Sequence, residues 1–141
     1  MPVYVSTYCI TGETGTNVID SLAQAGIKNI ELGSRAVFYN TRPSEIVRPG
    51  TSFLAHNYFI KPDKPFVLNL ASQNKEILKQ SREYILKAID FCHGAGIPLL
   101  TIHAGFRIDP DVNLKFNKNT AIPAYDKSVD TFVKTIKIIN D

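Results

Sequence analysis

Two histidines each end a short apolar run and begin a loop rich in turn residues. His56 follows the run that starts at Thr51, and His103 follows the run that starts at Ile97. Neutral imidazole is the commonest metal ligand in proteins, and a rigid strand end holds it at little entropic cost. We therefore expect His56 and His103 to bind one divalent metal ion. The alternative for each is an ordinary core or capping hydrogen bond.

Two histidines do not complete such a site, because a catalytic metal takes at least three protein ligands. Glu31 lies in an apolar segment, where a carboxylate needs a partner. We take Glu31 as the candidate catalytic carboxylate, able to bind substrate hydroxyls, orient a ligand or assist proton transfer. The alternative is an outward side chain paired with Lys28 or with an arginine of the next loop.

Three other residues are candidates for binding a polar substrate. Asn57 and Asn69 flank the loop after His56, and Arg107 lies in the loop after His103. Asparagines in such places often bond their own loop backbone. Arg107 is equally well placed for a surface pair with Asp109.

Residues 33–50 mix basic and aromatic side chains in the manner of surfaces that bind nucleic acids. The alternative is a solvated lid with a few packing anchors. The residues concerned are Arg35, Phe38, Tyr39, Arg42 and Arg48.

The elements that must position these residues alternate between strand and helix. Apolar and β-branched runs predict strands over residues 3–10, 27–32, 51–56 and 97–103. Helical periodicity predicts helices from an N-cap at Asn17 to Gly26, over residues 74–95, and around residues 129–139. The second of these helices is expected to turn one stripe inward, made of Ile77, Ser81, Tyr84, Ile85, Ala88, Ile89 and Cys92. The last is expected to be amphipathic, with an apolar face of Val129, Phe132, Val133, Ile136 and Ile139. A short helix near residues 43–47 and an ordered loop over residues 57–72 complete the pattern.

Composition places the chain among ordinary globular proteins. It has 141 residues, 44% of them hydrophobic and 21% charged, with a net charge of +3 that permits an anionic substrate without demanding a nucleic acid. No segment is long and apolar enough to span a bilayer, and the N-terminus lacks a signal-peptide pattern. We expect a cytoplasmic location. Cys9 and Cys92 are far apart in sequence and are expected to be buried thiols.

Four strands that alternate with helices predict an α/β fold with a parallel sheet. A complete eight-unit barrel typically needs about 250 residues, so residues 1–141 match its first four units, a single partial domain. The missing half or a second copy of the chain is then needed to close the barrel, and we favour the missing half. A free-standing doubly wound sheet is the alternative, but the turn after the first strand lacks a glycine-rich phosphate fingerprint.

Three motifs carry a resemblance to a known family. They are residues 55–58 (Ala-His-Asn-Tyr), residues 65–72 (Pro-Phe-Val-Leu-Asn-Leu-Ala-Ser) and residues 100–106 (Leu-Thr-Ile-His-Ala-Gly-Phe). Together they resemble the xylose isomerase-like TIM barrels, which include sugar phosphate isomerases and epimerases and endonuclease IV. The resemblance implies metal-ligand roles for His56 and His103, with the remaining ligands on strands that follow residue 141.

The isomerase branch of that family implies a divalent ion (Zn, Mn, Mg or Co) and proton transfer through an enediolate of a sugar or sugar phosphate. The endonuclease branch implies zinc-dependent hydrolysis of a phosphodiester at abasic DNA. We rank it second, because residues 59–64 intervene between Tyr58 and Pro65 and alter the loop that would probe a duplex. A non-catalytic half barrel that binds a sugar or a partner chain is the third hypothesis.

Overall fold

The computed structural model describes residues 2–11, 13–34, 38, 40–62 and 64–140. They form two compact units, which are described separately. The first unit comprises Met1–Lys61 and Ala88–Ile102, and the second comprises Pro62–Lys87 and His103–Asp141.

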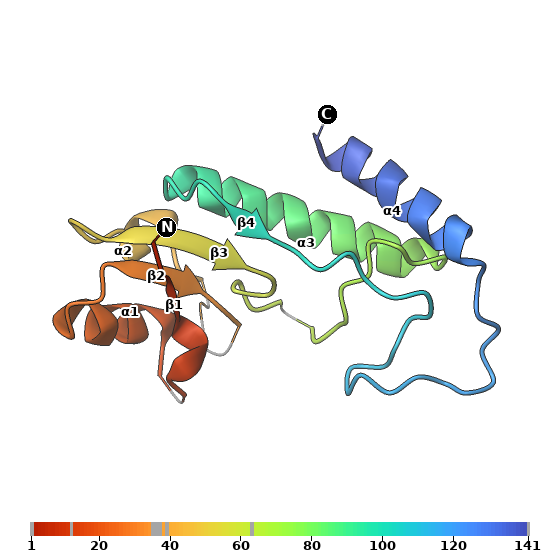
Figure 1. The fold of residues 1–141 in the computed structure, drawn as a ribbon, viewed down its shortest axis with the longest axis horizontal. Helices are drawn as coiled ribbons and strands as arrows, with labels where there is room; N and C mark the ends of the chain where they lie inside the picture. The colour runs from red at the N-terminus through yellow and green to blue at the C-terminus, as the bar shows by residue number, and fades with distance from the viewer. Residues whose placement is uncertain (1, 12, 35–37, 39, 63, 141) are drawn as a thin grey trace. The chain divides into compact units, whose positions relative to one another are not determined.

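A four-stranded parallel sheet organises the first unit (Figure 1). Its strands follow the chain in the order β1-β2-β3-β4, and each neighbouring pair is parallel. The predicted α/β class and parallel pairing are confirmed. The strands are β1 (Val5–Ser6), β2 (Asn29–Leu32), β3 (Ser52–His56) and β4 (Leu100–Thr101).

The two edge strands are shorter than their apolar runs predict. After β1 the chain turns into a 3-10 helix, η1 (Thr7–Cys9). The buried Thr7 hydroxyl accepts a hydrogen bond from the backbone N–H of Gly33 at 2.8 Å, so a side chain takes over where the strand ladder stops. β4 ends at Thr101, two residues before His103.

The first helix, α1 (Gly15–Gln24), begins earlier than its sequence pattern predicts. Its N-cap is Thr14, whose hydroxyl accepts from the backbone N–H of Asn17 at 3.4 Å, so the N-cap prediction at Asn17 was wrong. Gly26, with φ of 80°, follows the end of the helix, where a residue without Cβ adopts the left-handed region without strain. The short helix α2 (Pro43–Ile46) is confirmed, with its proline at the start where a missing N–H costs nothing.

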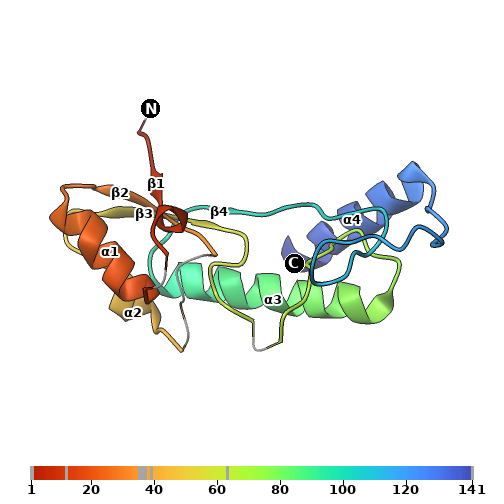
Figure 2. The ribbon, with the colours of Figure 1, turned by 90° about the horizontal axis from the view of Figure 1, so that it is seen from below.

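Alternation of side chains along the strands places the hydrophobic core on one face of the sheet. Ile30 and Leu32 of β2 and Phe53 and Ala55 of β3 are buried, while the residues between them are half-buried. Figure 2 shows α1 and α2 on one side of the strands. The core cluster joins those strand residues to side chains from the helices, including Val18, Ile19, Leu22, Ile46, Ala88 and Cys92.

The opposite face of the sheet carries a different set of side chains. Because register partners in a parallel sheet point to the same side, Ser6, Glu31 and Leu54 form one row, and His56 and Thr101 form the next. No helix of the described part of this unit contributes to a core on this face. The sheet therefore separates its packing residues from its polar ones.

The longest helix, α3 (Lys75–Gly94), begins in the second unit and ends in the first. Ser81, Tyr84 and Ile85 of its predicted inward stripe are buried in the structure. Ile89 is 39% exposed, so its place in that stripe was wrong. The side of α3 that faces the sheet is occupied by Ala88 and Cys92, and Ile89 lies outside it.

The last helix, α4 (Tyr125–Asn140), confirms the predicted C-terminal helix. Three residues of its predicted apolar face are half-buried, namely Phe132, Ile136 and Ile139, and they lie beside the buried Ser128 and Thr135. Val129 and Val133 are exposed, so their place in that face was wrong. The Thr135 hydroxyl donates to the carbonyl of Thr131 at 2.8 Å. No helix among the described residues is long and apolar enough to cross a membrane.

The two cysteines differ in their surroundings. Cys9 is exposed, which corrects the expectation of two buried thiols; it ends η1, at the surface. Cys92 is buried against the sheet, and this burial raises the pKa of its thiol to about 11.

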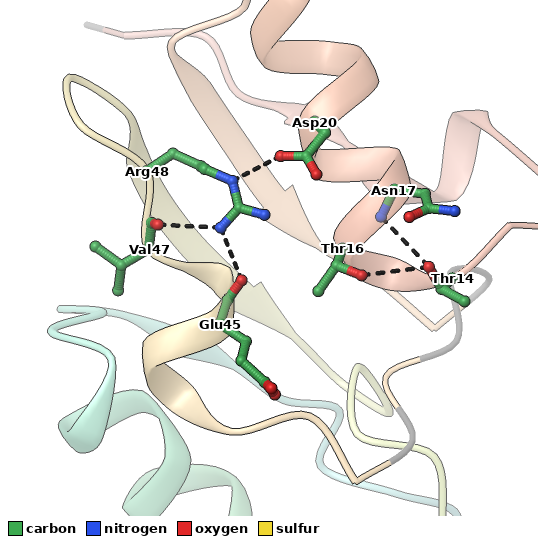
Figure 3. Close-up of polar contacts among 7 residues, drawn as sticks. All are labelled: Thr14, Thr16, Asn17, Asp20, Glu45, Val47 and Arg48. Atoms are coloured by element: carbon green, nitrogen blue, oxygen red, sulfur yellow. Dashed lines mark hydrogen bonds and ion pairs between the residues drawn. The ribbon is translucent and has the colours of Figure 1, made fainter.

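Arg48 fastens the loop before β3 to α1 (Figure 3). Its Nε donates to Oδ1 of Asp20 at 2.6 Å, and its Nη1 donates to the carbonyls of Glu45 at 2.7 Å and Val47 at 3.1 Å. The guanidinium beside Asp20 lowers the pKa of that carboxyl, chiefly through the hydrogen bond. This contact ties α1, α2 and the entry to β3 together.

We expect Gly15→Ala to destabilise the protein by about 1–3 kcal/mol, because a Cβ there overlaps the buried ring of Phe38 and forces the packed core to move. Urea unfolding followed by circular dichroism measures the loss. The matched control is Asn17→Ala, an exposed site in the same helix, which should change stability by at most about 0.5 kcal/mol. Equal stability of the two variants would show that the ring has room to move.

We expect Asp20→Asn to cost no more than about 1 kcal/mol at neutral pH, since the Asp20 carboxylate is half exposed to solvent. Its folded pKa lies below the unfolded value of 3.8, so the ion pair contributes fully above 3.8 and is lost as the pH falls through the folded value. Urea unfolding at a series of pH values should therefore show wild type and variant converging in acid. A gap that persists at about pH 2 would contradict the ion-pair account.

Candidate functional site

His56 is held by its register partner on the neighbouring strand. The last residue of β3 stands beside Thr101 of β4, and Nδ1 of His56 lies 2.7 Å from the Thr101 hydroxyl. The ladder continues one residue further, because the backbone N–H of Asn57 donates to the Thr101 carbonyl at 3.0 Å. A histidine bonded through one ring nitrogen is oriented to coordinate a metal through the other.

Glu31 lies on the same face of the sheet as His56, one strand away. It pairs in register with Leu54, two residues before His56 on β3. Among the described residues, no hydrogen bond or ion pair engages its carboxylate, so the predicted alternative of a pair with Lys28 is not found. A half-buried carboxylate of this kind can accept a proton or bind a hydroxyl.

Asn57 is only 4% exposed, and its side-chain oxygen has no hydrogen-bond partner among the described residues. A buried acceptor without a donor costs about 1–3 kcal/mol. Its position directly after His56 makes it a place where a water molecule or a hydroxyl donor is accommodated favourably. Substrate binding by Asn57 stays a prediction.

The other candidates belong to the second unit. His103 is exposed and is the first residue of that unit after the first ends at Ile102. His56 and His103 are thus described in separate units, and their shared metal site stays a prediction. Arg107 donates through Nε to the carbonyl of Pro123 at 3.2 Å, so it closes the long loop before α4 rather than pairing with Asp109.

Asn69 is the centre of a buried polar network in the second unit. Its Oδ1 accepts from the backbone N–H groups of Ala71 at 3.1 Å and Phe106 at 2.9 Å. Its Nδ2 donates to the Phe106 carbonyl at 2.9 Å and to Oδ1 of Asp109 at 2.7 Å. These four bonds fill the hydrogen-bonding capacity of one amide. Asn69 therefore organises the loop, as the alternative to substrate binding supposes.

Two neighbours complete this network. Ser72 donates to Oδ2 of Asp109 at 2.8 Å, so both carboxylate oxygens are held. Gly105 has φ of 119°, and a Cβ there would overlap the side chain of Asn69. Glycine is required at this position both for the backbone conformation and for the close approach.

An open hollow of about 470 Å³ borders the network in the second unit. Among the described residues of the network, only Asp109 lines the hollow, and Asn57, Asn69 and Arg107 do not line it. The lining residues are Ile77, Asp109, Pro110, Asp111, Lys115, Phe116 and Asn117.

The described part of the basic and aromatic loop has structural partners. Phe38 is 2% exposed and packs edge-on against Phe59, with ring centroids 6.5 Å apart. Arg42 pairs with Glu45 at 3.2 Å, and Arg48 is bound to Asp20. Arg35 and Tyr39 lie outside the described residues. Phe38 is thus a packing anchor, as the lid alternative supposes, and no stacking surface.

The described residues contain no group of three or more His, Cys, Asp or Glu side chains arranged to hold a metal ion. The first unit offers His56 and Glu31, which is fewer ligands than a catalytic metal takes. No protein-family model matches the chain, and no curated protein matches it.

Sequence analysis missed Thr101, Asp109 and Thr7 as organising residues. Thr101 was detectable in principle, because it precedes His103 by two residues on a predicted strand and so faces the same side. Asp109 was seen only as a partner for Arg107. Its real partners, Asn69 and Ser72, are more than 35 residues away in sequence.

We expect Asn69→Asp to lower the free energy of unfolding by about 2–4 kcal/mol, because an oxygen replaces the Nδ2 donor and faces the Asp109 carboxylate. Asp109→Asn is the matched control: it keeps an acceptor for Asn69 and should cost at most about 1 kcal/mol. Both are measured by urea unfolding at neutral pH. If Asn69→Asp proves as stable as wild type, the network does not hold this loop.

Proposed function

We propose that this chain supplies the first four β/α units of a xylose isomerase-like barrel that acts as a divalent-metal-dependent isomerase or epimerase of a sugar or sugar phosphate. One observation carries the proposal: Glu31 and His56 share a face of the parallel sheet, near the carboxyl ends of β2 and β3, and the core formed by the described residues lies on the other face. In barrels of parallel strands that face is the interior, and its carboxyl end holds the active site.

The order of the strands supports a barrel over a doubly wound sheet. A doubly wound sheet reverses its strand order at a switch point, whereas here each strand adds to the one before it. The helices that form the core with this sheet contact the same face of it. Further strands, from additional polypeptide or from a second copy, would then continue from β4 and close on β1.

In this proposal His56 is a metal ligand through Nε2, and Thr101 holds its other nitrogen. His103 would be a second ligand, and the remaining ligands lie outside these residues. A divalent ion held there supplies polarisation of the substrate's carbonyl and hydroxyl oxygens. Glu31 binds a substrate hydroxyl or helps move the proton, and Asn57 offers its unpartnered oxygen to a hydroxyl donor. Arg107 is the candidate for a substrate phosphate.

We propose a cytoplasmic location.

Proton transfer through an enediolate has a direct signature. We expect the polypeptide that carries these residues, in full length and with Mn²⁺, Co²⁺, Mg²⁺ or Zn²⁺, to incorporate deuterium from D₂O next to the carbonyl of one sugar or sugar phosphate in a panel. Proton NMR measures the exchange. Cleavage of abasic duplex DNA without any sugar exchange would favour the endonuclease alternative and contradict the isomerase.

The metal site has its own test in His56→Ala. We expect this variant to weaken Co²⁺ or Zn²⁺ binding at least tenfold, because a ligand is lost at a strand end that the fold holds rigid. The matched control is His93→Ala, which removes the exposed histidine near the end of α3. Isothermal titration measures both. Equal weakening by the two variants would show adventitious surface binding rather than a site at His56.

A further inference from the structure

A row of apolar side chains on α4, the helix drawn in blue in Figure 1, faces solvent. Tyr125, Val129 and Val133 are spaced four residues apart, so they lie one above another on the helix surface. They are 67%, 37% and 43% exposed. Single exposed apolar residues are ordinary, whereas a continuous row at helical spacing indicates a surface that packs against another.

Half-buried neighbours widen this row into an apolar strip. Phe132 and Ile136 follow two members of the row at a spacing of three, and with the row they form what we call the α4 strip. The buried residues of the helix, Ser128 and Thr135, lie to one side of this strip. The second unit therefore holds α4 by one edge of its apolar face and leaves the rest of that face to solvent.

Charged side chains beside the α4 strip divide by sign along the helix. Asp126 and Asp130 lie beside its N-terminal half, and Lys137 lies beside its C-terminal half. All three are exposed, and within the described part of the chain no ion pair engages any of them. Lys127 and Lys134 lie farther away, on the opposite side of the helix.

This order of charges matches a second copy of the same helix in antiparallel orientation. A pair centred near Val133 places Asp130 of each copy opposite Lys137 of the other, with apolar side chains between the two helices. A parallel pair would set Asp126 and Asp130 beside the same residues of the other copy, and like charges repel. The antiparallel pair is isologous, which is the form that a closed two-fold dimer requires.

We propose that the α4 strip is the interface between two copies of this chain, paired α4 against α4 in antiparallel order about a two-fold axis near Val133. The inference goes beyond the proposed function and does not depend on it. Glu31 and His56 belong to the sheet of the first unit, whereas α4 belongs to the second.

The length of the strip sets the expected strength of the dimer. A helix of 16 residues is about 24 Å long. An interface of that length buries less than the roughly 800 Å² per partner of a standard complex, so we expect a dissociation constant on the order of 100 μM. Sedimentation velocity of the 141-residue chain at concentrations from about 10 μM to about 1 mM measures it. A reducing agent prevents a disulfide between copies through the exposed Cys9.

Val133→Glu tests the apolar contact. We expect it to weaken association at least about tenfold, because it brings two carboxylates together near the two-fold axis. The matched control is Ile138→Glu, the same change at an exposed apolar residue of α4 that lies away from the strip. The control should change the dissociation constant by less than about twofold. Circular dichroism confirms that both variants keep their helices.

Charge reversal tests the antiparallel order. Asp126→Lys/Asp130→Lys makes every charge beside the strip positive, and Lys137→Asp makes every one negative, so each variant alone should associate at least about fivefold more weakly. An equal mixture of the two should dimerise at least as well as the wild type. The dipole of a single helix also favours acids at its N-terminus and bases at its C-terminus, but mixing two variants cannot restore that effect.

Protein that stays monomeric at about 1 mM would overturn the proposal and leave additional polypeptide as the cover of the α4 strip. Association that Val133→Glu leaves unchanged would overturn it too, because the interface would then lie elsewhere. If the mixed charge variants do not associate, the antiparallel order is wrong. None of these results bears on the metal site, which His56→Ala tests separately.

Discussion

The in-register parallel sheet is the constraint on which the rest of the first unit depends. Successive side chains of a strand point to opposite faces, so one register decides which residues pack and which remain available for chemistry. Here Ile30 and Ala55 fall on the core side, and Glu31 and His56 fall on the other. A slip of one residue would bury the carboxylate and the imidazole and expose the core, which hydrophobic burial forbids.

The same sheet is the reason for proposing additional strands that close a barrel. All-parallel sheets are nearly always covered on both faces, because their crossover helices and neighbouring strands bury them. In the first unit the described core covers one face, and β1 and β4 are edge strands of two residues each. Open edges invite pairing with more chain, and closing the sheet into a barrel removes both edges and encloses the polar face.

Sequence predicted the elements better than the contacts. The apolar runs predicted β2 and β3 nearly to the residue, because each alternates buried and half-buried side chains against a helix-covered face. It overestimated β1, because the Thr7 hydroxyl replaces the ladder at Gly33, a bond between residues 26 apart. The same holds for the candidate site residues. The position of His56 at the end of a strand was predictable from its apolar run, whereas the partners of Asn69 come from loop residues more than 35 positions away, which no local sequence pattern indicates.

The central claim is that the polar face of this sheet holds a divalent ion through His56. Diffraction from crystals soaked in Co²⁺ or Zn²⁺, with data collected at the absorption edge of the metal, tests it most directly. The account predicts an anomalous peak about 2.1 Å from Nε2 of His56, with Nδ1 still bonded to Thr101. A peak on Nδ1, or metal bound elsewhere while the His56 ring stays without it, would contradict the account.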